Sequence, residues 1–342
     1  MTSPGSGDYA IAPVRRFWPH ADMLVLTDEE QSRLLAPAEI LAAVGAAALA
    51  LDQGTATVPP RLHVEHCGNT LLAMPAASAS AFGTKLVSVF PGNAGRGLPV
   101  ITGLMVLNDA ATGQPLALLN AAGLTARRTG AVGALGVKHR TPADLDSVGI
   151  VGAGVQGAWQ AIFACAVRPI REIFVVTRSP ERLAEFRSTV LRGAPGVKIT
   201  VCRGARELLE RTHLVIAATT SATPVLPDEP ALLEGKHFIS VGSFRPAMQE
   251  LPDAVYRLAG ELAIDSDFAR PEVGDIVNPL ARGLLRAENI YPIAAAISGR
   301  RSVTPGRTTA YKTAGMALFD LFVAEALYAA ARTAGVGREI EI

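Results

Sequence analysis

The feature that most constrains the fold of this chain is the glycine pattern in the run GIVGAGVQG. Gly152, Gly154 and Gly157 form G-x-G-x-x-G between an apolar run and a helical pattern. In that context the first glycine permits a tight turn, the second lets a pyrophosphate approach the backbone, and the third lets helix and strand pack closely. An ordinary strand–turn–helix is the alternative. The pattern predicts a dinucleotide-binding turn in which the three glycines, together with Val155 and Gln156 at the start of the helix, bind the cofactor.

The sequence around this turn predicts a parallel sheet. From Ser147 onward, compact apolar strands alternate with helical segments, and such alternation is typical of a sheet with helices on both faces. The expected strands lie in the runs SVGIVGA, EIFVVTR, VKITVC, HLVIAATT, HFISVGS and ELAIDS. The expected fold class is therefore α/β, with a Rossmann dinucleotide-binding domain.

The region before this domain has a different texture. Residues 58–119 contain short apolar runs separated by Gly, Pro and Asn, which predicts a mostly antiparallel sheet. Asp109 to Pro115 is expected to be a hairpin turn, with Gly113 at positive φ. Helical spacing predicts one helix from Pro37 to Leu51 and another from Thr125 to Val137.

The two ends of the chain differ in their patterns. Residues 1–20 are rich in Gly, Pro and Ser, which predicts a loose tail. The pattern from Tyr311 to Ala334 predicts a long helix that is too apolar to stand alone and must pack on another element.

Composition limits the kinds of partner. A chain of 342 residues with 49% hydrophobic residues is long enough for two domains with sizeable cores. Lys plus Arg number 32 against 31 Asp plus Glu, so little net charge attracts nucleic acid or an anionic membrane. These values favour a small-molecule partner.

The cysteines and the N-terminal residues indicate the compartment. Cys67, Cys165 and Cys202 lie far apart in the sequence, so no disulfide framework or cysteine-rich zinc site is indicated. His66 and Cys67 are adjacent on an expected strand and point to opposite faces, so we expect no metal site there. No secretory signal or membrane-spanning run is recognisable, and we expect a cytoplasmic protein.

The residues at the end of the second Rossmann strand indicate which nicotinamide cofactor the protein prefers. Enzymes that use NAD usually place an acidic residue there to hold the ribose 2′-hydroxyl, whereas this chain has Thr177, Arg178 and Ser179. A guanidinium binds a 2′-phosphate in bidentate fashion, so we expect NADP(H) to be preferred over NAD(H). A solvated loop charge at Arg178 is the alternative.

Several blocks together resemble the ornithine cyclodeaminase/μ-crystallin family, from about Pro59 to Leu327. The matching blocks are Arg61 followed by MPA, TKLVSVFPGNAGRGLP, GLTARRTGAVGALG, VGAGVQG, AATTSATPVL, VGSFRP and YKTAGMALFDL. The resemblance implies a Rossmann NAD(P)-binding domain, residues 129–306, inserted into an α+β substrate-binding and dimerisation domain of residues 1–128 and 307–342. It also implies a homodimer.

The resemblance further implies a substrate site. Arg61 and Arg128 are expected to hold the carboxylate of an imino or amino acid, with Lys85 as the catalytic residue beside the reacting carbon. Two guanidiniums suit carboxylate recognition, and the pKa of an enclosed lysine is lowered toward proton transfer. Arg127 and Arg128 point to different sides of a helix, and the T-A-x-R-T pattern selects Arg128.

Two further observations refine these expectations. Thr219, Thr220 and Thr313 are expected to contact the cofactor. Related cyclodeaminases and archaeal alanine dehydrogenases commonly carry a catalytic aspartate after a Rossmann strand, where this chain has Phe244. A phenyl ring cannot accept a proton, so the sequence looks more like the ketimine reductase branch of the family.

The leading hypothesis is therefore NAD(P)H-dependent reduction of a cyclic ketimino acid, Δ1-pyrroline-2-carboxylate or Δ1-piperideine-2-carboxylate, by hydride transfer. An ornithine cyclodeaminase or an alanine dehydrogenase-type oxidoreductase is the second hypothesis, since it would use the same cofactor site and arginines. A non-catalytic NADPH-binding or ligand-binding protein resembling μ-crystallin is the third.

Overall fold

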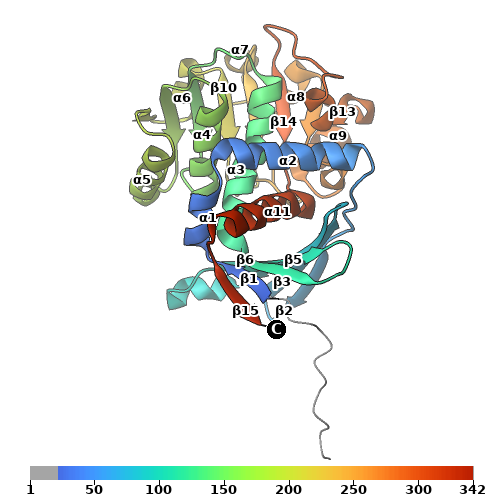
Figure 1. The fold of residues 1–342 in the computed structure, drawn as a ribbon. Helices are drawn as coiled ribbons and strands as arrows, with labels where there is room; N and C mark the ends of the chain where they lie inside the picture. The colour runs from blue at the N-terminus through green and yellow to red at the C-terminus, as the bar shows by residue number, and fades with distance from the viewer. Residues whose placement is uncertain (1–21, 342) are drawn as a thin grey trace, which may run out of the picture.

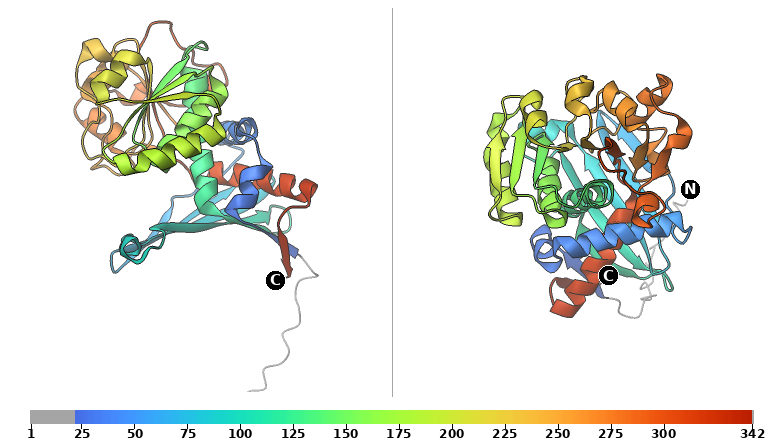
Figure 2. Two further views of the ribbon diagram at one scale, coloured as in Figure 1. Left: turned by 90° about the vertical axis from the view of Figure 1, so that its left-hand side faces the viewer. Right: turned by 90° about the horizontal axis from the view of Figure 1, so that it is seen from above.

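A computed structural model describes residues 22–341 and contains two sheets (Figures 1 and 2). The seven-stranded sheet has the strand order β15-β1-β6-β5-β4-β3-β2, and the eight-stranded sheet has the order β13-β12-β14-β11-β10-β7-β8-β9. One long helix, α3 (Ala121–Arg140), contacts strands of both sheets. The predicted loose tail at the N-terminus lies outside the described residues.

The seven-stranded sheet confirms the antiparallel region that the sequence predicts. Its neighbouring strands are all antiparallel except β1 and β6, which are parallel. The strands are β1 (Asp22–Leu26), β2 (Leu62–His66), β3 (Asn69–Ala77), β4 (Ala81–Val89), β5 (Ile101–Asp109), β6 (Pro115–Asn120) and β15 (Arg338–Glu341). The short helix η1 (Pro91–Arg96) connects β4 to β5.

The predicted hairpin turn between β5 and β6 is also confirmed. The Asp109 carboxylate accepts the backbone N–H groups of Ala111 at 3.1 Å and Thr112 at 2.7 Å. Gly113 has a φ of 73°, a conformation that costs glycine little because it has no Cβ.

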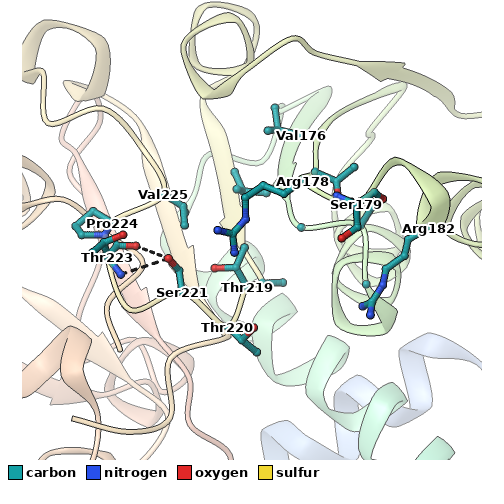
Figure 3. Close-up of a pocket in the computed structure, with 16 residues that line it drawn as sticks. Val176, Arg178, Ser179, Arg182, Thr219, Thr220, Ser221, Thr223, Pro224 and Val225 are labelled. Atoms are coloured by element: carbon teal, nitrogen blue, oxygen red, sulfur yellow. Dashed lines mark hydrogen bonds between the residues drawn. The ribbon is translucent and has the colours of Figure 1, made fainter. Parts of the chain in front are cut away.

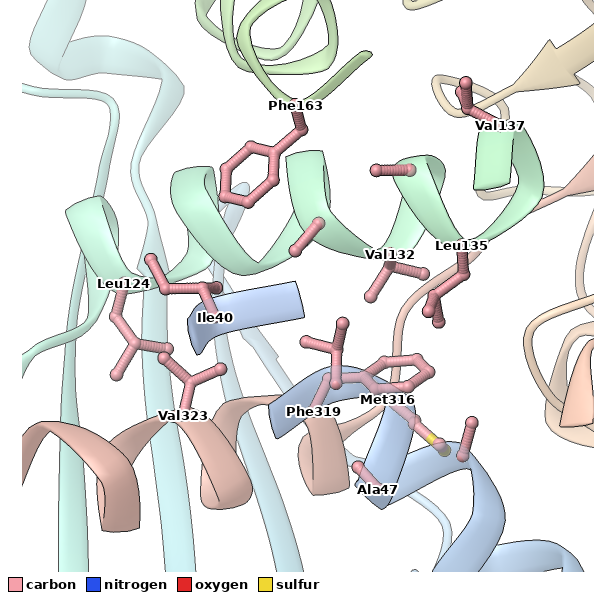
Figure 4. Close-up of a cluster of buried hydrophobic side chains, with 14 of the residues drawn as sticks. Ile40, Ala47, Leu124, Val132, Leu135, Val137, Phe163, Met316, Phe319 and Val323 are labelled. Atoms are coloured by element: carbon pink, nitrogen blue, oxygen red, sulfur yellow. The ribbon is translucent and has the colours of Figure 1, made fainter. Parts of the chain in front are cut away.

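Helices cover one face of the seven-stranded sheet (Figure 2). They are α1 (Asp28–Leu34), α2 (Pro37–Asp52), α3 and α11 (Ala317–Ala334). Apolar side chains of α2, α3 and α11 meet in one core, shown in Figure 4 by Ile40, Ala47, Leu124, Val132, Leu135, Phe319 and Val323. Within residues 22–341 no single helix is both long and apolar enough to cross a membrane. Only α1 and α2 taken together reach that length and composition, and they are bent by 93°.

The eight-stranded sheet is the predicted parallel sheet, and every pair of neighbouring strands in it is parallel. Its strands are β7 (Ser147–Val151), β8 (Glu172–Val176), β9 (Lys198–Val201), β10 (Leu214–Ala217), β11 (His237–Ser240), β12 (Leu262–Ile264), β13 (Ile290–Pro292) and β14 (Thr309–Lys312). The connecting helices are α4 (Val155–Val167), α5 (Leu183–Gly193), α6 (Ala205–Arg211), α7 (Pro230–Leu233), α8 (Asp253–Ala259), α9 (Gly274–Ala281) and α10 (Ala294–Ile297), with short turns η2 (Pro180–Arg182), η3 (Asp267–Ala269) and η4 (Ala287–Asn289).

The structure corrects the sequence prediction at β14. A helix was expected from Tyr311 onward, but residues 309–312 form a strand between β11 and β12, and α11 begins only at Ala317. The assignment of residues 307–342 to the substrate domain is wrong for this strand, which lies within the Rossmann sheet. A short apolar run that is buried on both faces has no periodicity to separate a strand from a helix. Gly315, with a φ of 76°, then separates β14 from α11.

Close packing of α3 on α4 depends on glycine. A Cβ added at Gly130 would lie 2.8 Å from the carbonyl oxygen of Trp159 and 2.7 Å from Cδ2 of Phe163. Phe163 itself points at α3 in Figure 4. Because one of these atoms belongs to the backbone, a larger residue would force the two helices apart.

We predict that Gly130→Ala lowers the free energy of unfolding by about 1–3 kcal/mol, even though alanine is the better helix former by about 1 kcal/mol. Urea unfolding measures the change. Gly45→Ala on α2 is the control, since its added Cβ would meet only Leu135 Cδ2 at an ordinary 3.7 Å. Equal stability changes in the two variants would contradict the close contact.

Candidate active site

The glycine pattern forms a tight turn between β7 and α4. Gly152 has a φ of 108°, and its N–H donates to the carbonyl of Val176 at 2.8 Å. A Cβ at Gly157 would overlap the carbonyl oxygen of Gly152, so only glycine allows α4 to pack this closely on the turn. A Cβ at Gly154 would meet nothing closer than Arg182 Nη1 at 3.6 Å, which leaves room for a ligand at the start of α4.

A cavity of about 360 Å³ opens beside this turn, at the carboxyl ends of β7, β8 and β10 (Figure 3). In open parallel sheets this edge is where ligands bind. Of the predicted cofactor residues, Gly152, Gly154, Thr177, Arg178, Thr219 and Thr220 line the cavity. Val155, Gln156, Gly157 and Thr313 are not among its lining residues, although the first three belong to the same turn and helix.

Two arginines face this cavity, and none of its lining residues within the described part of the chain, 22–341, is acidic. Arg178 follows β8, whereas Arg182 ends the short helix η2 and lies near the start of α4 (Figure 3). Sequence reasoning missed Arg182, although the run TRSPER carries both arginines within one turn. The cavity therefore presents two guanidiniums and several hydroxyl groups to an anionic ligand.

A second group of polar side chains lies beneath the seven-stranded sheet's helices. Lys85 of β4 donates from Nζ to Asp320 Oδ2 of α11 at 2.8 Å, and Arg128 of α3 donates from Nε to Asp320 Oδ1 at 3.1 Å. All three side chains are buried, and Asp320 is fully enclosed. Sequence reasoning missed Asp320, whose signal is a lone acid in the apolar run ALFDLFVA.

Burial and neighbouring charges shift the pKa values of this cluster. Removal from water lowers the pKa of Lys85 to about 8, and the positive charges of Arg128 and Arg61 act in the same direction, whereas Asp320 opposes them. Burial alone would raise the pKa of Asp320, but Arg128 and Lys85 hold it below its usual value. Lys85 thus gives up its proton more readily than an exposed lysine does.

The structure brings the three predicted substrate residues into one region. Arg61 lines a cavity of about 240 Å³ together with Met74, which is paired with Lys85 across β3 and β4. Arg61 is about a quarter exposed, and its Nη2 lies 3.5 Å from Glu272 Oε2. Arg127 points elsewhere, as predicted, and its Nη2 lies 2.8 Å from Asp28 Oδ1.

Hydrogen bonds connect the cofactor-side cavity to the carboxyl ends of the central strands. The Glu250 carboxylate accepts from the backbone N–H and the hydroxyl of Thr219, at 2.6 and 2.8 Å, and from the hydroxyl of Ser240 at 2.8 Å. It also accepts the N–H of Gly242 at 2.6 Å. Ser240 in turn accepts from Lys312 Nζ at 3.1 Å. Glu250, which sequence reasoning also missed, therefore fixes the ends of β10 and β11 against each other.

A second buried acid fixes the segment between β14 and α11. Asp265 Oδ2 accepts the N–H groups of Ala314 at 2.8 Å and Gly315 at 2.6 Å. Gly315 lies against the guanidinium of Arg128, since a Cβ added there would be 2.5 Å from Nη1. The end of the Rossmann sheet and the Lys85–Asp320–Arg128 cluster are therefore in direct contact.

Phe244 lies in the loop after β11, where it is half exposed and Cζ of Arg245 is 5.3 Å from the ring centroid. No carboxylate stands at this position. The nearby acids Glu250 and Asp275 are buried and occupied by hydrogen bonds: the Glu250 carboxylate accepts the backbone N–H of Ser243, and the Asp275 carboxylate accepts the backbone N–H of Glu250. Within residues 22–341 no group of three or more His, Cys, Asp or Glu side chains could hold a metal ion.

The Rossmann sheet, its phosphate-binding turn and the adjoining Lys85 cluster define a two-domain oxidoreductase. The chain belongs to the ornithine cyclodeaminase/mu-crystallin family, whose sequence profile matches residues 21–335. This confirms the resemblance seen in the sequence.

Individual relatives cover nearly the whole chain. A Δ1-pyrroline-2-carboxylate reductase of Bacillus cereus is 35% identical over 93% of this chain and 100% of its own. The structure of Thermococcus litoralis Δ1-pyrroline-2-carboxylate reductase in complex with NADH and L-proline is 31% identical, covers 93% of this chain and 100% of its own, and superposes with a TM-score of 0.85. An archaeal alanine dehydrogenase dimer with bound NAD is 28% identical over 94% of this chain and 99% of its own, also with a TM-score of 0.85.

Proposed function

We propose that the protein is an NAD(P)H-dependent reductase of a cyclic ketimino acid, Δ1-pyrroline-2-carboxylate or Δ1-piperideine-2-carboxylate, which it converts to proline or pipecolate. The observation that carries the proposal is the enclosed Lys85 beside Arg128, with Arg61 nearby and no carboxylate at Phe244. The reductases of Bacillus and Thermococcus among the relatives support it.

The residues around the glycine turn fit a nicotinamide dinucleotide. Gly154 leaves open space at the start of α4, and the free N–H groups there suit a pyrophosphate. When bound, the reduced cofactor supplies the hydride. Arg178 and Arg182, with no acid among the described residues that line the cavity, favour a 2′-phosphate and hence NADPH over NADH.

The arginines orient the substrate. Arg128 uses Nε for Asp320, and its two terminal nitrogens have no hydrogen-bond partner within residues 22–341. These two nitrogens form a planar fork that suits the carboxylate next to the imine carbon. Arg61, at the rim of its cavity, adds a second positive charge. Fixing the carboxylate positions the C=N bond for hydride attack. We expect this orientation to contribute more to the rate than proton donation does.

Lys85 supplies the proton. Hydride addition converts the imine carbon to C–H, and the imine nitrogen must gain one proton to become the amine. With a pKa of about 8, Lys85 is mostly protonated at neutral pH and still donates readily. Asp320 holds the ammonium in place and keeps its pKa from falling further. Solvent then returns the proton to Lys85.

Two other functions differ from this one in their measurable products. A cyclodeaminase would release ammonia from ornithine with catalytic NAD, and an alanine-type dehydrogenase would need ammonia to reduce pyruvate. A non-catalytic binder would hold NADPH tightly without turning over any imine. Phe244 disfavours the deaminase, because no carboxylate there can take the proton. The buried Lys85 and Arg128 disfavour the binder.

The experiment that tests the proposal is a panel of cyclic ketimines, linear imines, ornithine, and pyruvate with ammonia, each assayed with both cofactors. Oxidation of NADPH with a cyclic ketimine, and formation of the matching cyclic amino acid, is the expected result. Absence of turnover with every cyclic ketimine would refute the proposal.

We also propose a homodimer that forms through the face of the seven-stranded sheet on which no helix of residues 22–341 packs, called here the uncovered face (Figure 2). Large apolar side chains are exposed on strands β2 to β5, namely Leu62, Val64, Leu71, Phe82, Leu86 and Leu104. A contiguous apolar surface of this kind is typical of a protein interface. A relative described as a dimer supports this proposal.

Arg128→Lys tests the carboxylate fork, because it keeps the charge but loses the planar guanidinium. We expect kcat/KM to fall about ten- to a thousandfold, equivalent to about 1.4–4 kcal/mol, with the affinity for NADPH nearly unchanged. Arg127→Lys is the control. It should retain kcat/KM while losing some stability, because Arg127 pairs with Asp28 and Gln31. A larger loss at Arg127 would mean that the substrate site is misassigned.

Asp320→Asn tests the control of Lys85. Asp320 raises the pKa of Lys85, so its neutralisation should lower that pKa below about 8. Activity that needs protonated Lys85 is lost as pH rises through this pKa, so the alkaline limb of kcat/KM should move to lower pH. Glu325→Gln on the same helix is the control. An unmoved limb in a folded Asp320→Asn enzyme would contradict the role of this pair.

Arg178→Asp tests cofactor choice. Loss of a guanidinium and gain of a carboxylate should weaken NADPH at least tenfold and leave NADH unchanged or tighter. The measurement is the ratio of kcat/KM for the two cofactors. Arg192→Gln, an exposed arginine on α5 outside the cavity, is the control. An unchanged ratio would show that Arg178 is only a surface charge.

Leu104→Glu tests the dimer, since Leu104 lies in the middle strands of the uncovered face. A charge buried in an apolar interface is costly, so the variant should be monomeric at concentrations where the unaltered protein is a dimer. Light scattering after size exclusion reports the mass. Leu191→Glu, at an exposed leucine of α5, is the matched control and should leave the mass unchanged.

A further inference from the structure

A second polar cavity, of about 450 Å³, lies at the opposite edge of the Rossmann sheet from the cofactor-side cavity. Glu261 and Thr309 line it at the amino ends of β12 and β14, whereas the glycine turn lies at the carboxyl ends of its strands. Because all strands of this sheet are parallel, these two edges are on opposite sides of the domain. Nothing in the proposed reaction uses this second cavity.

Arginine dominates its lining. Arg140, Arg300, Arg301 and Arg307 line the cavity, and Glu261 is the only acid among its lining residues within 22–341. Arg140 and Arg301 both pair with Glu261, so one carboxylate serves two guanidiniums. Arg300 pairs with Asp52 of α2, which lies outside the lining. Four guanidiniums thus face two carboxylates, which leaves two positive charges in excess.

The cluster is built around a buried member. Arg140, the last residue of α3, is about 3% exposed, and its Nη1 donates to the carbonyl of Ser302 at 3.3 Å. The Cζ atoms of Arg140 and Arg301 lie 5.5 and 4.9 Å from the ring centroid of Tyr291. The aromatic ring and Glu261 therefore hold two like charges close together, an arrangement that an additional anion would stabilise.

One guanidinium in the cavity is free for a ligand. Arg307 is exposed, and its guanidinium has no ion-pair or hydrogen-bond partner within residues 22–341. The side chains of Ser302 and Thr304 add hydroxyl donors to the same lining. A planar guanidinium donates two parallel hydrogen bonds to phosphate oxygens, and neighbouring hydroxyls complete such a site.

We propose that this cavity, defined by Arg140, Arg300, Arg301 and Arg307, binds a phosphoryl group of a small dianionic ligand. The excess of two positive charges matches a phosphate dianion and exceeds the single charge of a monocarboxylate such as the proposed substrate. The site is independent of the cofactor pocket, whose arginines lie at the other edge of the sheet.

The site is connected to the substrate residues by two elements. Helix α3 carries Arg140 at its end and Arg128 twelve residues earlier, which is about 18 Å along a helix. Strand β14 carries Thr309 in the cavity lining and Lys312 at its other end. A ligand at this cavity therefore contacts the same helix and strand that support the substrate site.

Calorimetric titration of the full-length protein tests the proposal, with saturating NADPH to occupy the cofactor pocket. The probes are inorganic phosphate, pyrophosphate, AMP and acetate. We expect phosphate, pyrophosphate or AMP to bind more tightly than acetate, with an affinity that falls as salt rises. Tighter binding of AMP than of pyrophosphate would identify a phosphorylated metabolite, and the reverse order would identify a free anion.

Arg301→Gln and Arg307→Gln should each weaken this binding at least tenfold, whereas Arg192→Gln on α5 should not change it. All three arginines are exposed, so the fold should persist, and thermal unfolding checks that it does. No binding, binding no tighter than that of acetate, or binding that both cavity variants retain would overturn the proposal. Reductase activity is not the readout, so failure here is separate from failure of the proposed function.

Discussion

The carboxylate of Asp320 is the group on which the proposed substrate site depends. It is fully enclosed and accepts from Lys85 on β4 and Arg128 on α3, residues 235 and 192 positions away in the sequence. Two buried cations without a counter-charge would be strongly destabilising, because removing one partner of a buried pair costs about 3–5 kcal/mol. The same carboxylate therefore holds three elements together and sets how firmly Lys85 keeps its proton.

The cofactor side depends on a steric constraint rather than a charge. At Gly157 a side chain would overlap the carbonyl of Gly152, and at Gly154 it would fill the space left for a ligand. Glu250 then ties the ends of β10 and β11, so the edge of the sheet that faces the cavity is fixed before any ligand binds. Preorganisation of this kind reduces the entropy that is lost when a ligand binds.

Two elements, α3 and β14, connect the cofactor part of the structure to the substrate part. Helix α3 packs against α4 through Gly130 and reaches the substrate site through Arg128. Strand β14 lies inside the Rossmann sheet, and the segment after it, held by Asp265, contacts Arg128. The substrate and cofactor parts therefore cannot shift freely relative to each other without breaking packed or hydrogen-bonded contacts.

Local patterns in the sequence determined much of this protein. The glycine turn, the alternation after Ser147, the antiparallel region and the hairpin at Gly113 all follow from short-range rules on φ, periodicity and strand spacing. The place of Arg178 at the cofactor cavity could also be predicted, because it directly follows the second strand of the Rossmann pattern. Long-range contacts decided the rest. The strand β14, hidden in a helical pattern, is defined by its neighbours β11 and β12.

The partnership of Asp320 with Lys85 and Arg128, the clamp formed by Glu250, and the meeting of four arginines at the far edge of the sheet have no local signal. A single acid in an apolar helix predicts that the acid has a buried partner, but it does not predict which residue that partner is. Sequence fixes what each segment can form by itself, since backbone preferences act over a few residues. Only the tertiary structure determines which buried charges meet, because that depends on how separate segments of the chain pack against one another.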